Sequence, residues 1–186
     1  MRRVTYSMSV SLDGYVHGPD GDFDWPGLSD EVFDIALAEI RAVGVHLMGR
    51  RLYEAMLYWE TVDEEALAVP VREWLGMWNA LPKVVFSTTL STVQGNARLA
   101  EANLADEIER LRAESAEGDI AIGGATLAAE AATLGLIDEY YIRTYPVLVG
   151  GGLPFFARDE RRVDLELLGA RAFDSGVVYL RYRVRR

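Results

Sequence analysis

The sequence predicts an α/β protein with a three-layer α-β-α fold, in which a mostly parallel mixed sheet is closed by a C-terminal antiparallel hairpin. Short apolar segments alternate with helix-like segments along most of the chain, which is typical of successive β-α-β units. Two of the apolar segments pass through glycine directly into helix-forming residues, at Gly49 and at Gly123-Gly124. Near the end, two strand-like segments flank Asp174-Ser175-Gly176, which predicts the hairpin.

Length and composition predict one globular domain, residues 1–186, with a single core. No apolar run approaches the ~18 residues of a membrane span, so we expect no membrane partner. The chain has no cysteine and only two histidines, which excludes disulfides and leaves no metal site to be expected. The net charge of −10 disfavours a nucleic-acid partner, whose phosphates would be repelled. We expect a soluble, cytoplasmic protein.

The first strand is predicted at residues 4–12, where apolar and hydroxyl-bearing side chains alternate. Asp13-Gly14 interrupts this strand, and residues 15–16 resume it. The loop that follows ends in aromatic residues, among them Trp25. Such a loop can close over a ligand, and a tryptophan that plugs the edge of the core is an equal alternative.

The first helix is predicted to begin at Ser29, an N-cap residue followed by the acidic Asp30, and to end at Gly44. Residues 45–48 then predict a short buried strand. Its histidine, His46, lies between apolar residues and fits a core or edge position.

The second helix follows Gly49 directly and carries Arg50 and Arg51 in its first turn. Cations oppose the helix dipole there, because the N-terminus of a helix favours anions. Their position makes sense if a phosphate neutralises them, since the guanidinium fork matches phosphate oxygens. Two solvated arginines are the alternative.

The middle of the chain continues this alternation. Residues 64–81 predict a helix with an apolar, tryptophan-containing stripe that faces the core. Residues 83–86 predict the next strand, and residues 87–89 place three hydroxyls at its carboxyl end. Residues 103–112 predict another amphipathic helix.

The stretch at residues 118–126 is the one around which the rest of the chain is organised. An apolar strand ends there in Gly123-Gly124 and enters a helix at Ala125. Unpaired N–H groups and the helix dipole attract anions at such a junction, and glycine lets a phosphate approach the backbone. A tight turn without a ligand is an equal alternative. Another strand, residues 137–149, completes this β-α-β unit.

The predicted hairpin pairs residues 165–173 with residues 177–184. In its second strand Arg181, Arg183 and Arg185 share one face. A solvated strand face is the simplest interpretation of that row.

Three predicted strand ends therefore carry groups that suit a ligand: residues 49–51, 87–89 and 123–126. Ligands of open α/β sheets lie outside the carboxyl ends of the strands. Together these segments predict one long, phosphate-bearing ligand across that edge of the sheet.

Five motifs span nearly the whole chain: Ser11-Leu12-Asp13-Gly14, Met48-Gly49-Arg50-Arg51-Leu52-Tyr53-Glu54, Val85-Phe86-Ser87-Thr88, Ile122-Gly123-Gly124 and Pro146-Val147-Leu148-Val149-Gly150-Gly151-Gly152-Leu153-Pro154. With these motifs in this order, the sequence resembles the dihydrofolate reductase superfamily. The closest branch contains the reductase (C-terminal) domain of the bifunctional riboflavin-biosynthesis deaminase/reductase. The resemblance implies a dihydrofolate-reductase-like fold and a homodimer.

The resemblance also implies NADPH as hydride donor. Arg50 would bind the 2′-phosphate, the backbone around Leu52 and Gly124 the pyrophosphate, and the segments beside the Asp13-Gly14 turn the nicotinamide. The cofactor-binding residues that it implies are Ser9, Asp13, Gly14, Val16, Gly49, Arg50, Arg51, Leu52, Ser87, Thr88, Gly123, Gly124, Ala125, Thr126 and Leu127.

For the substrate side, the resemblance implies roles for Trp25 and Asp30. Trp25 matches an aromatic residue of the loop that covers the reacting rings. Asp30 matches the carboxylate that binds the pterin and assists protonation in folate-reducing members, so Asp30 is the candidate catalytic residue.

Three departures separate this chain from the folate-reducing members. Those members carry an arginine for the glutamate tail of folate just before the third strand, where this chain has residues 80–82 followed by Lys83. Leu52 replaces a frequent threonine, and Ala128 replaces a tyrosine near the nicotinamide. The first departure disfavours folate as the substrate.

The predicted function is therefore an NADPH-dependent reductase of a small heterocyclic or conjugated carbonyl or imine substrate. Two alternatives remain: a nucleotide-binding module or ligand sensor without turnover, and a pyrimidine reductase of riboflavin biosynthesis. The substrate of that pathway carries a phosphorylated chain, for which the sequence has no additional basic cluster.

Overall fold

The computed structural model describes residues 1–25, 29–156 and 161–186, and one eight-stranded sheet forms its centre. Its strands are β1 (Val4–Ser11), β3 (Val43–Gly49), β4 (Lys83–Phe86), β5 (Ala97–Leu99), β6 (Asp119–Gly123), β7 (Glu139–Tyr145), β9 (Leu165–Ala172) and β10 (Val178–Val184). They lie in the order β5-β4-β3-β6-β1-β7-β10-β9, parallel as far as β7 and antiparallel beyond it. This confirms the predicted mostly parallel sheet and its antiparallel closure. Two short strands, β2 (Tyr15–His17) and β8 (Leu153–Pro154), pair outside this sheet.

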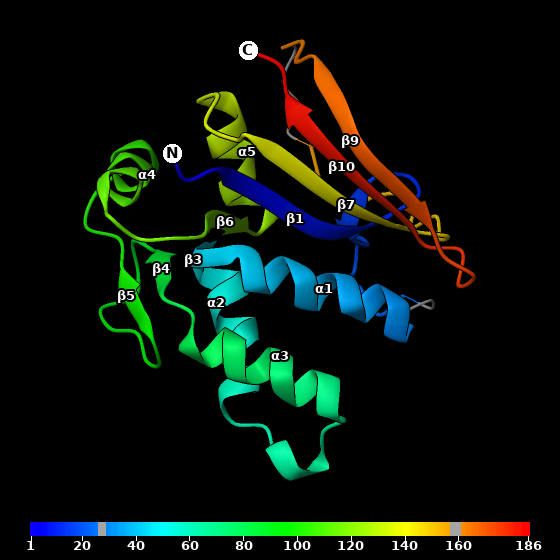
Figure 1. Ribbon diagram of the computed structural model, residues 1–186, viewed down its shortest axis with the longest axis horizontal. Helices are drawn as coiled ribbons and strands as arrows, with labels where there is room; N and C mark the ends of the chain where they lie inside the picture. Colours follow the sequence, from blue (N-terminus) through cyan, green and yellow to red (C-terminus); the bar gives the residue numbers. More distant parts are fainter. Residues whose placement is uncertain (26–28, 157–160) are drawn as a thin grey trace.

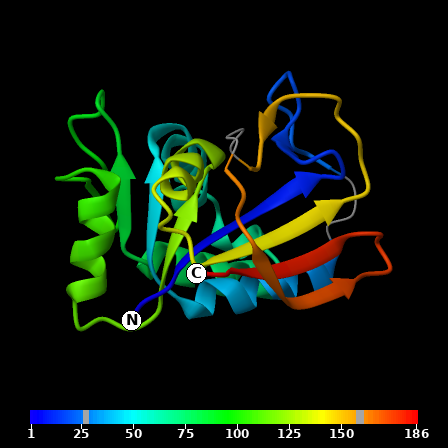
Figure 2. The same cartoon turned by 90° about the horizontal axis from the view of Figure 1, so that it is seen from above.

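Helices cover both faces of the sheet and complete the three layers (Figure 1). One face carries α1 (Asp30–Ala42), α2 (Arg50–Met56), α3 (Val69–Ala80) and the 3₁₀ helices η1 (Leu57–Glu60) and η2 (Glu64–Ala66). The other face carries α4 (Leu104–Ala113) and α5 (Ala125–Thr133). Figure 2 shows α4 beside β5 at one end of the molecule and the β9–β10 hairpin at the other. Among the described helices, none is both long and apolar enough to cross a membrane.

Side-chain caps fix the starts of two helices, and the sequence predicts the first of them, at Ser29. The Ser29 hydroxyl accepts a hydrogen bond from the Val32 N–H of α1 at 3.4 Å, and Asn103 accepts one from the Asp106 N–H of α4 at 3.0 Å. The first helix ends at Ala42, two residues before the predicted Gly44, because β3 already begins at the next residue.

The helix predicted at residues 64–81 is wrong in its first part. Only a 3₁₀ turn forms at Glu64–Ala66, and α3 begins at Val69, with Pro70 in its first turn. Proline has no N–H to bond the preceding turn and disfavours helical backbone before it, so a helix starts there rather than running through. The strand predicted at residues 137–149 is shorter than expected, and the three-residue β5 has no counterpart among the predicted strands.

The central strand β1 separates an apolar core from a polar layer. Val4, Tyr6 and Val10 lie in the core beneath α4 and α5. Ser7 and Ser9 point to the opposite face, where the Glu39 carboxylate on α1 accepts from the Ser7 hydroxyl at 2.7 Å. The alternation predicted from the sequence therefore separates side chains that face two different helical layers. It does not separate a buried face from a solvated face.

Arg183 and Arg185 on β10 are exposed, as the sequence suggests, but the row of arginines also has a buried partner. Arg181 and Arg183, together with Arg3, surround the carboxylate of Glu139, whose side chain is only 1% exposed. Burial alone would raise the pKa of Glu139, but the Tyr141 hydroxyl and these arginines lower it below its usual value. Glu139 lies on the neighbouring strand β7, so the sheet register and not the local pattern determines this cluster.

Candidate functional site

The three strand ends that carry ligand-suitable groups lie side by side. β4, β3 and β6 are neighbours in the sheet, and Gly49 is in register with Phe86 while Met48 is in register with Gly123. Their carboxyl ends meet at one edge, where the chain enters α2, the 87–89 loop and α5. The predicted convergence of these segments is confirmed.

An exposed arginine and the 87–89 loop form one polar patch at this edge. Arg50 donates from Nη1 to the Thr89 hydroxyl at 2.7 Å and from Nε to Glu54 at 2.8 Å. The Ser87 hydroxyl accepts from the N–H groups of Thr89 and Leu90, at 3.1 and 3.0 Å, which fixes the loop. The Arg50 side chain is 48% exposed and can turn toward a phosphate in solvent. Arg51 and Thr88 are also exposed.

The two glycines of the organising stretch have different roles. A Cβ added at Gly123 would lie 2.4 Å from Cε1 of His46 and 2.5 Å from Cδ2 of Leu52, so packing excludes a side chain there. Gly124 instead has φ +88° and is the N-cap of α5, while a Cβ there would meet only Leu52, at 3.8 and 3.9 Å. The backbone at Gly124 is thus open to an approaching group.

The N-terminus of α5 has the donors that an anion needs. No side chain of the described residues caps this helix, and its first bonded N–H is that of Ala128, which donates to Gly124 O at 3.1 Å. The N–H groups of residues 125–127 precede that first helical bond, and Thr126 is exposed. These groups and the exposed guanidinium of Arg50 fit the phosphates of a dinucleotide.

The Asp13-Gly14 turn is tied to the loop that follows β7. The Asp13 carboxylate accepts from the N–H groups of Gly150 at 2.7 Å and Val149 at 3.2 Å. A hydrogen bond from Ser11 and these two backbone donors lower the pKa of Asp13. The carboxylate of Asp13 therefore holds the turn and the loop after β7 together.

Trp25 and Asp30, the two predicted substrate residues, lie differently. The Trp25 ring packs against Tyr145 at a centroid distance of 5.7 Å, in a cluster with Val32 at the start of α1. Asp30 is exposed at the first position of α1, two residues before Val32.

A cavity of about 270 Å³ opens between α1 and the carboxyl-terminal parts of β1 and β7. Its walls are apolar: Val32, Phe33 and Ala36 come from α1, and the indoles of Trp59 and Trp74 come from η1 and α3. The two indoles contact each other edge to face at 5.3 Å.

The floor of this cavity is polar and comes from the sheet: Ser9 on β1, and Arg143 and Tyr145 on β7. Arg143 donates to the Glu39 carboxylate at 2.6 Å and to the Ser7 hydroxyl at 3.1 Å. The Arg143 and Glu39 side chains are each 14% exposed. Burial alone would lower the pKa of Arg143, but Glu39 more than compensates and raises it, so the guanidinium stays charged.

The sequence does not predict this cavity, although it contains one signal of it. Arg143 follows three aromatic and apolar residues of the predicted strand, Tyr140, Tyr141 and Ile142, and a charge beside such residues needs a partner. The partner, Glu39, is 104 residues away in the sequence, so the pair becomes visible only when α1 packs on the sheet.

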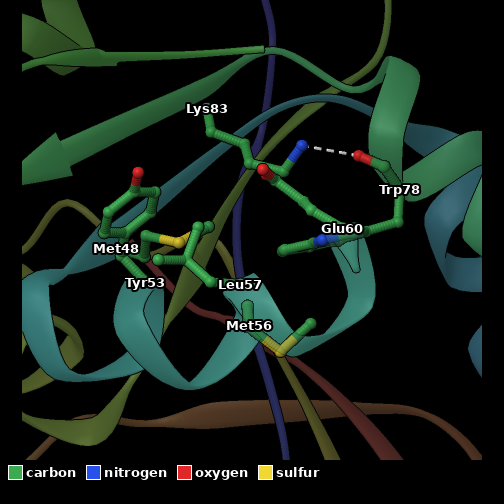
Figure 3. A pocket seen from close by; sticks show the side chains of 7 residues that line it. All are labelled: Met48, Tyr53, Met56, Leu57, Glu60, Trp78 and Lys83. Atoms are coloured by element: carbon green, nitrogen blue, oxygen red, sulfur yellow. Dashed lines mark hydrogen bonds between the residues drawn. The ribbon is translucent and has the colours of Figure 1, made fainter. Parts of the chain in front are cut away.

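A second hollow lies beneath α2, but the side chains that line it already fill it (Figure 3). Lys83 donates there to the carbonyl oxygens of Trp78 at 2.6 Å and Leu81 at 3.0 Å, with Glu60 nearby. The hollow has no volume for a water-sized molecule.

The family model described as "RibD C-terminal domain" matches residues 2–179 of the chain. The protein belongs to this family. That assignment confirms the resemblance to the reductase branch of the dihydrofolate reductase superfamily and supports a reductase role. The uncharacterized protein YyaP of Bacillus subtilis is 28% identical, over 97% of this chain and 94% of YyaP. The uncharacterized protein YwjB of Bacillus subtilis is 24% identical, over 95% of each chain.

Solved structures of the RibD family share the fold. A putative riboflavin biosynthesis protein from Shewanella sp. PV-4 matches with a TM-score of 0.80 at 24% identity, covering 99% of both chains. A pyrimidine reductase-like protein from Corynebacterium diphtheriae matches with a TM-score of 0.68 at 16% identity, over 100% of this chain and 92% of that one. RibD from Acinetobacter baumannii matches with a TM-score of 0.70 at 18% identity, and the chain spans 58% of that protein.

Proposed function

We propose that this protein is an NADPH-dependent reductase of a small conjugated carbonyl, imine or heterocyclic compound. The observation that carries the proposal is the position of the aromatic cavity. It lies at the carboxyl ends of β1 and β7, on the same edge of the sheet as the anion-binding groups at β4, β3 and β6. A dinucleotide held by those groups can extend toward β1 and bring its redox-active end to the cavity.

The residues for the cofactor follow from this arrangement. Arg50, with the Ser87 and Thr89 hydroxyls beside it, would bind the 2′-phosphate. The free N–H groups at the start of α5 would bind the pyrophosphate. Bound NADPH would supply a hydride, and this chain's contribution is to orient the two reactants and to exclude water from between them.

The substrate side depends on the cavity and on a source of protons. The indoles of Trp59 and Trp74 offer flat apolar surface to a ring, and Trp25 packs against Tyr145, which also lines the cavity. Asp30 is the proposed proton donor, and the alternative donor is water, since Asp30 is exposed and outside the cavity lining.

Two measurements test this function together. Calorimetric titration with NADPH establishes whether the cofactor binds, and NADPH oxidation across a panel of quinones, enones and cyclic imines establishes turnover. Tight NADPH binding without oxidation of any substrate would favour a nucleotide sensor. Absence of NADPH binding would exclude both functions.

A further inference from the structure

The charged pair on the cavity floor has no evident structural purpose. Replacing a buried ion pair by apolar residues of similar volume is often neutral or stabilising, so stability alone does not explain Arg143 and Glu39. Among the described residues, Oε1 of Glu39 is buried and accepts no hydrogen bond of good geometry, although the Tyr179 hydroxyl lies near this carboxylate. A costly polar group at the bottom of an apolar cavity indicates a ligand contact.

The floor presents hydrogen-bond donors to whatever occupies the cavity. Nη1 of Arg143 is used by Ser7 and Glu39, and Nε reaches the Ser9 hydroxyl at 3.4 Å. Nη2 has no acceptor among the described residues, and it is not one of the buried atoms that lack a partner. The guanidinium therefore retains free N–H groups on a residue that lines the cavity.

The floor also discriminates against charge. Arg143 is the only charged residue among those that line the cavity in the described part of the chain, and Glu39 at 2.6 Å already neutralises it. An anion would gain little from a cation whose charge is balanced, and the nearby carboxylate would repel it. A neutral acceptor, such as a carbonyl oxygen or a ring nitrogen, gains a hydrogen bond without this penalty.

The walls set the shape of the occupant. Trp59, Trp74 and Phe33 give the cavity an aromatic lining, which favours a flat ring that stacks or contacts edge to face. A volume of about 270 Å³ is below the usual range of ligand pockets, roughly 300–1,000 Å³, so only a small ring system fits.

We propose that this cavity binds the substrate as a small, flat, uncharged conjugated ring, whose carbonyl or imine acceptor is anchored by Arg143, and that Glu39 sets the preference for neutral over anionic compounds. This inference rests on the proposed reductase function. Arg143 is then a substrate-binding residue, and Glu39 is a positioning residue that acts through it.

The test uses two probes that differ in one charge: 1,4-naphthoquinone and its 2-sulfonate. Binding to the full-length protein is followed without NADPH, by quenching of tryptophan fluorescence and by calorimetry. The chain has no cysteine, so the quinones cannot alkylate a thiol. We expect the neutral quinone to bind at least about tenfold more tightly than the sulfonate, which corresponds to one discriminating polar contact.

Variants of Arg143 and Glu39 then test whether this pair causes the preference for the neutral quinone. Glu39→Gln should improve sulfonate binding by about tenfold, because it leaves the Arg143 charge unbalanced. Glu39→Leu combined with Arg143→Met leaves no unpaired buried charge, so it is expected to fold, and it should lose about tenfold in affinity for the neutral quinone. Arg41→Met, which breaks the exposed Arg41–Glu73 pair between α1 and α3, is the control and should change neither affinity.

The outcomes separate this inference from the reductase function. Equal binding of both quinones by the wild type, or quinone binding that the double variant leaves intact, would overturn the inference even if NADPH is oxidised. Quinone binding with the expected dependence on the pair would support it even if no NADPH is consumed, in which case the reductase function alone fails.

Discussion

The Cα atom of Gly123 lies against the imidazole of His46, so closely that an added Cβ would be 2.4 Å from Cε1. This contact encloses His46 between the end of β6 and the Trp78 ring, whose centroid is 5.2 Å from that of the imidazole. Nδ1 of His46 is buried and has no hydrogen-bond partner in the part of the chain that the structure describes. Burial, with a smaller contribution from the Lys83 charge, lowers the pKa of His46 to about 4.

The first prediction is that His46 makes the protein less stable in mild acid. The unfolded chain takes up this proton near pH 6.5, whereas the folded protein resists protonation until about pH 4. The contribution of neutral His46 to the free energy of unfolding is therefore fully present above pH 6.5. It is lost as the pH drops toward 4, which lowers the free energy of unfolding by about 1–3 kcal/mol. Urea unfolding at several pH values measures it, and His46→Gln should flatten the dependence between pH 6.5 and 5.

The matched control for this prediction is His17→Gln, which removes the only other histidine of the chain. The pH dependence of His17→Gln should follow that of the wild type. A wild-type slope that persists in His46→Gln would show that another group causes it.

The second prediction concerns Gly124, where the structure supports a ligand more directly than at Gly123. Its positive φ strains any side chain by about 1–2 kcal/mol, so Gly124→Ala and Gly124→Val should be destabilised to a similar extent. A Cβ there would contact Leu52 only at ordinary van der Waals distance, so the larger side chain mainly obstructs an approaching ligand. Gly124→Val should therefore abolish NADPH binding, while Gly124→Ala weakens it less. A folded Gly124→Val protein with wild-type affinity for NADPH would remove this junction from the site.

The third prediction is that Arg50 selects NADPH over NADH. Arg50→Ala should weaken NADPH binding by about 1.5–3 kcal/mol, the usual value of a hydrogen bond to a charged group, and should affect NADH much less. Titration of both nucleotides measures the difference, and Arg171→Ala, which breaks another exposed arginine pair, is the control. Equal losses for the two nucleotides would show that Arg50 does not contact the 2′-phosphate.

The sequence predicted what depends on local pattern and missed what depends on register. The fold class and the convergence at Gly49 and Gly123-Gly124 follow from segments that read as strand, turn and helix on their own. Arg143 and Glu39 could not be paired in advance, because α1 must first be placed across β1 and β7. The glycine pair was predicted to serve one ligand, yet Gly123 is required by packing and only Gly124 faces open space. Sequence spacing cannot distinguish these two reasons for a glycine.

The fourth prediction is that the protein is a homodimer, as its family resemblance implies. The motivating surface is the exposed apolar part of the chain after β7, where Leu148 is 71% and Phe156 is 49% exposed. Light scattering at micromolar concentration should give twice the monomer mass of 20.7 kDa. A mass near that of the monomer would reject the dimer.

The last prediction is that the protein is not an efficient dihydrofolate reductase, although it has that fold. A glutamate tail needs a fixed cation at the segment before β4, where this chain offers only Lys83. The structure removes that candidate, because Lys83 is 3% exposed and its ammonium group is bonded to the carbonyls of Trp78 and Leu81. Loss of such a contact costs about 1.5–3 kcal/mol, so kcat/KM for dihydrofolate should stay well below ~10⁴ M⁻¹s⁻¹. A tail-less pterin should be affected less, because only the tail lacks a partner. Steady-state oxidation of NADPH with the two compounds provides the comparison, and a value at or above ~10⁶ M⁻¹s⁻¹ for dihydrofolate would restore folate as the substrate.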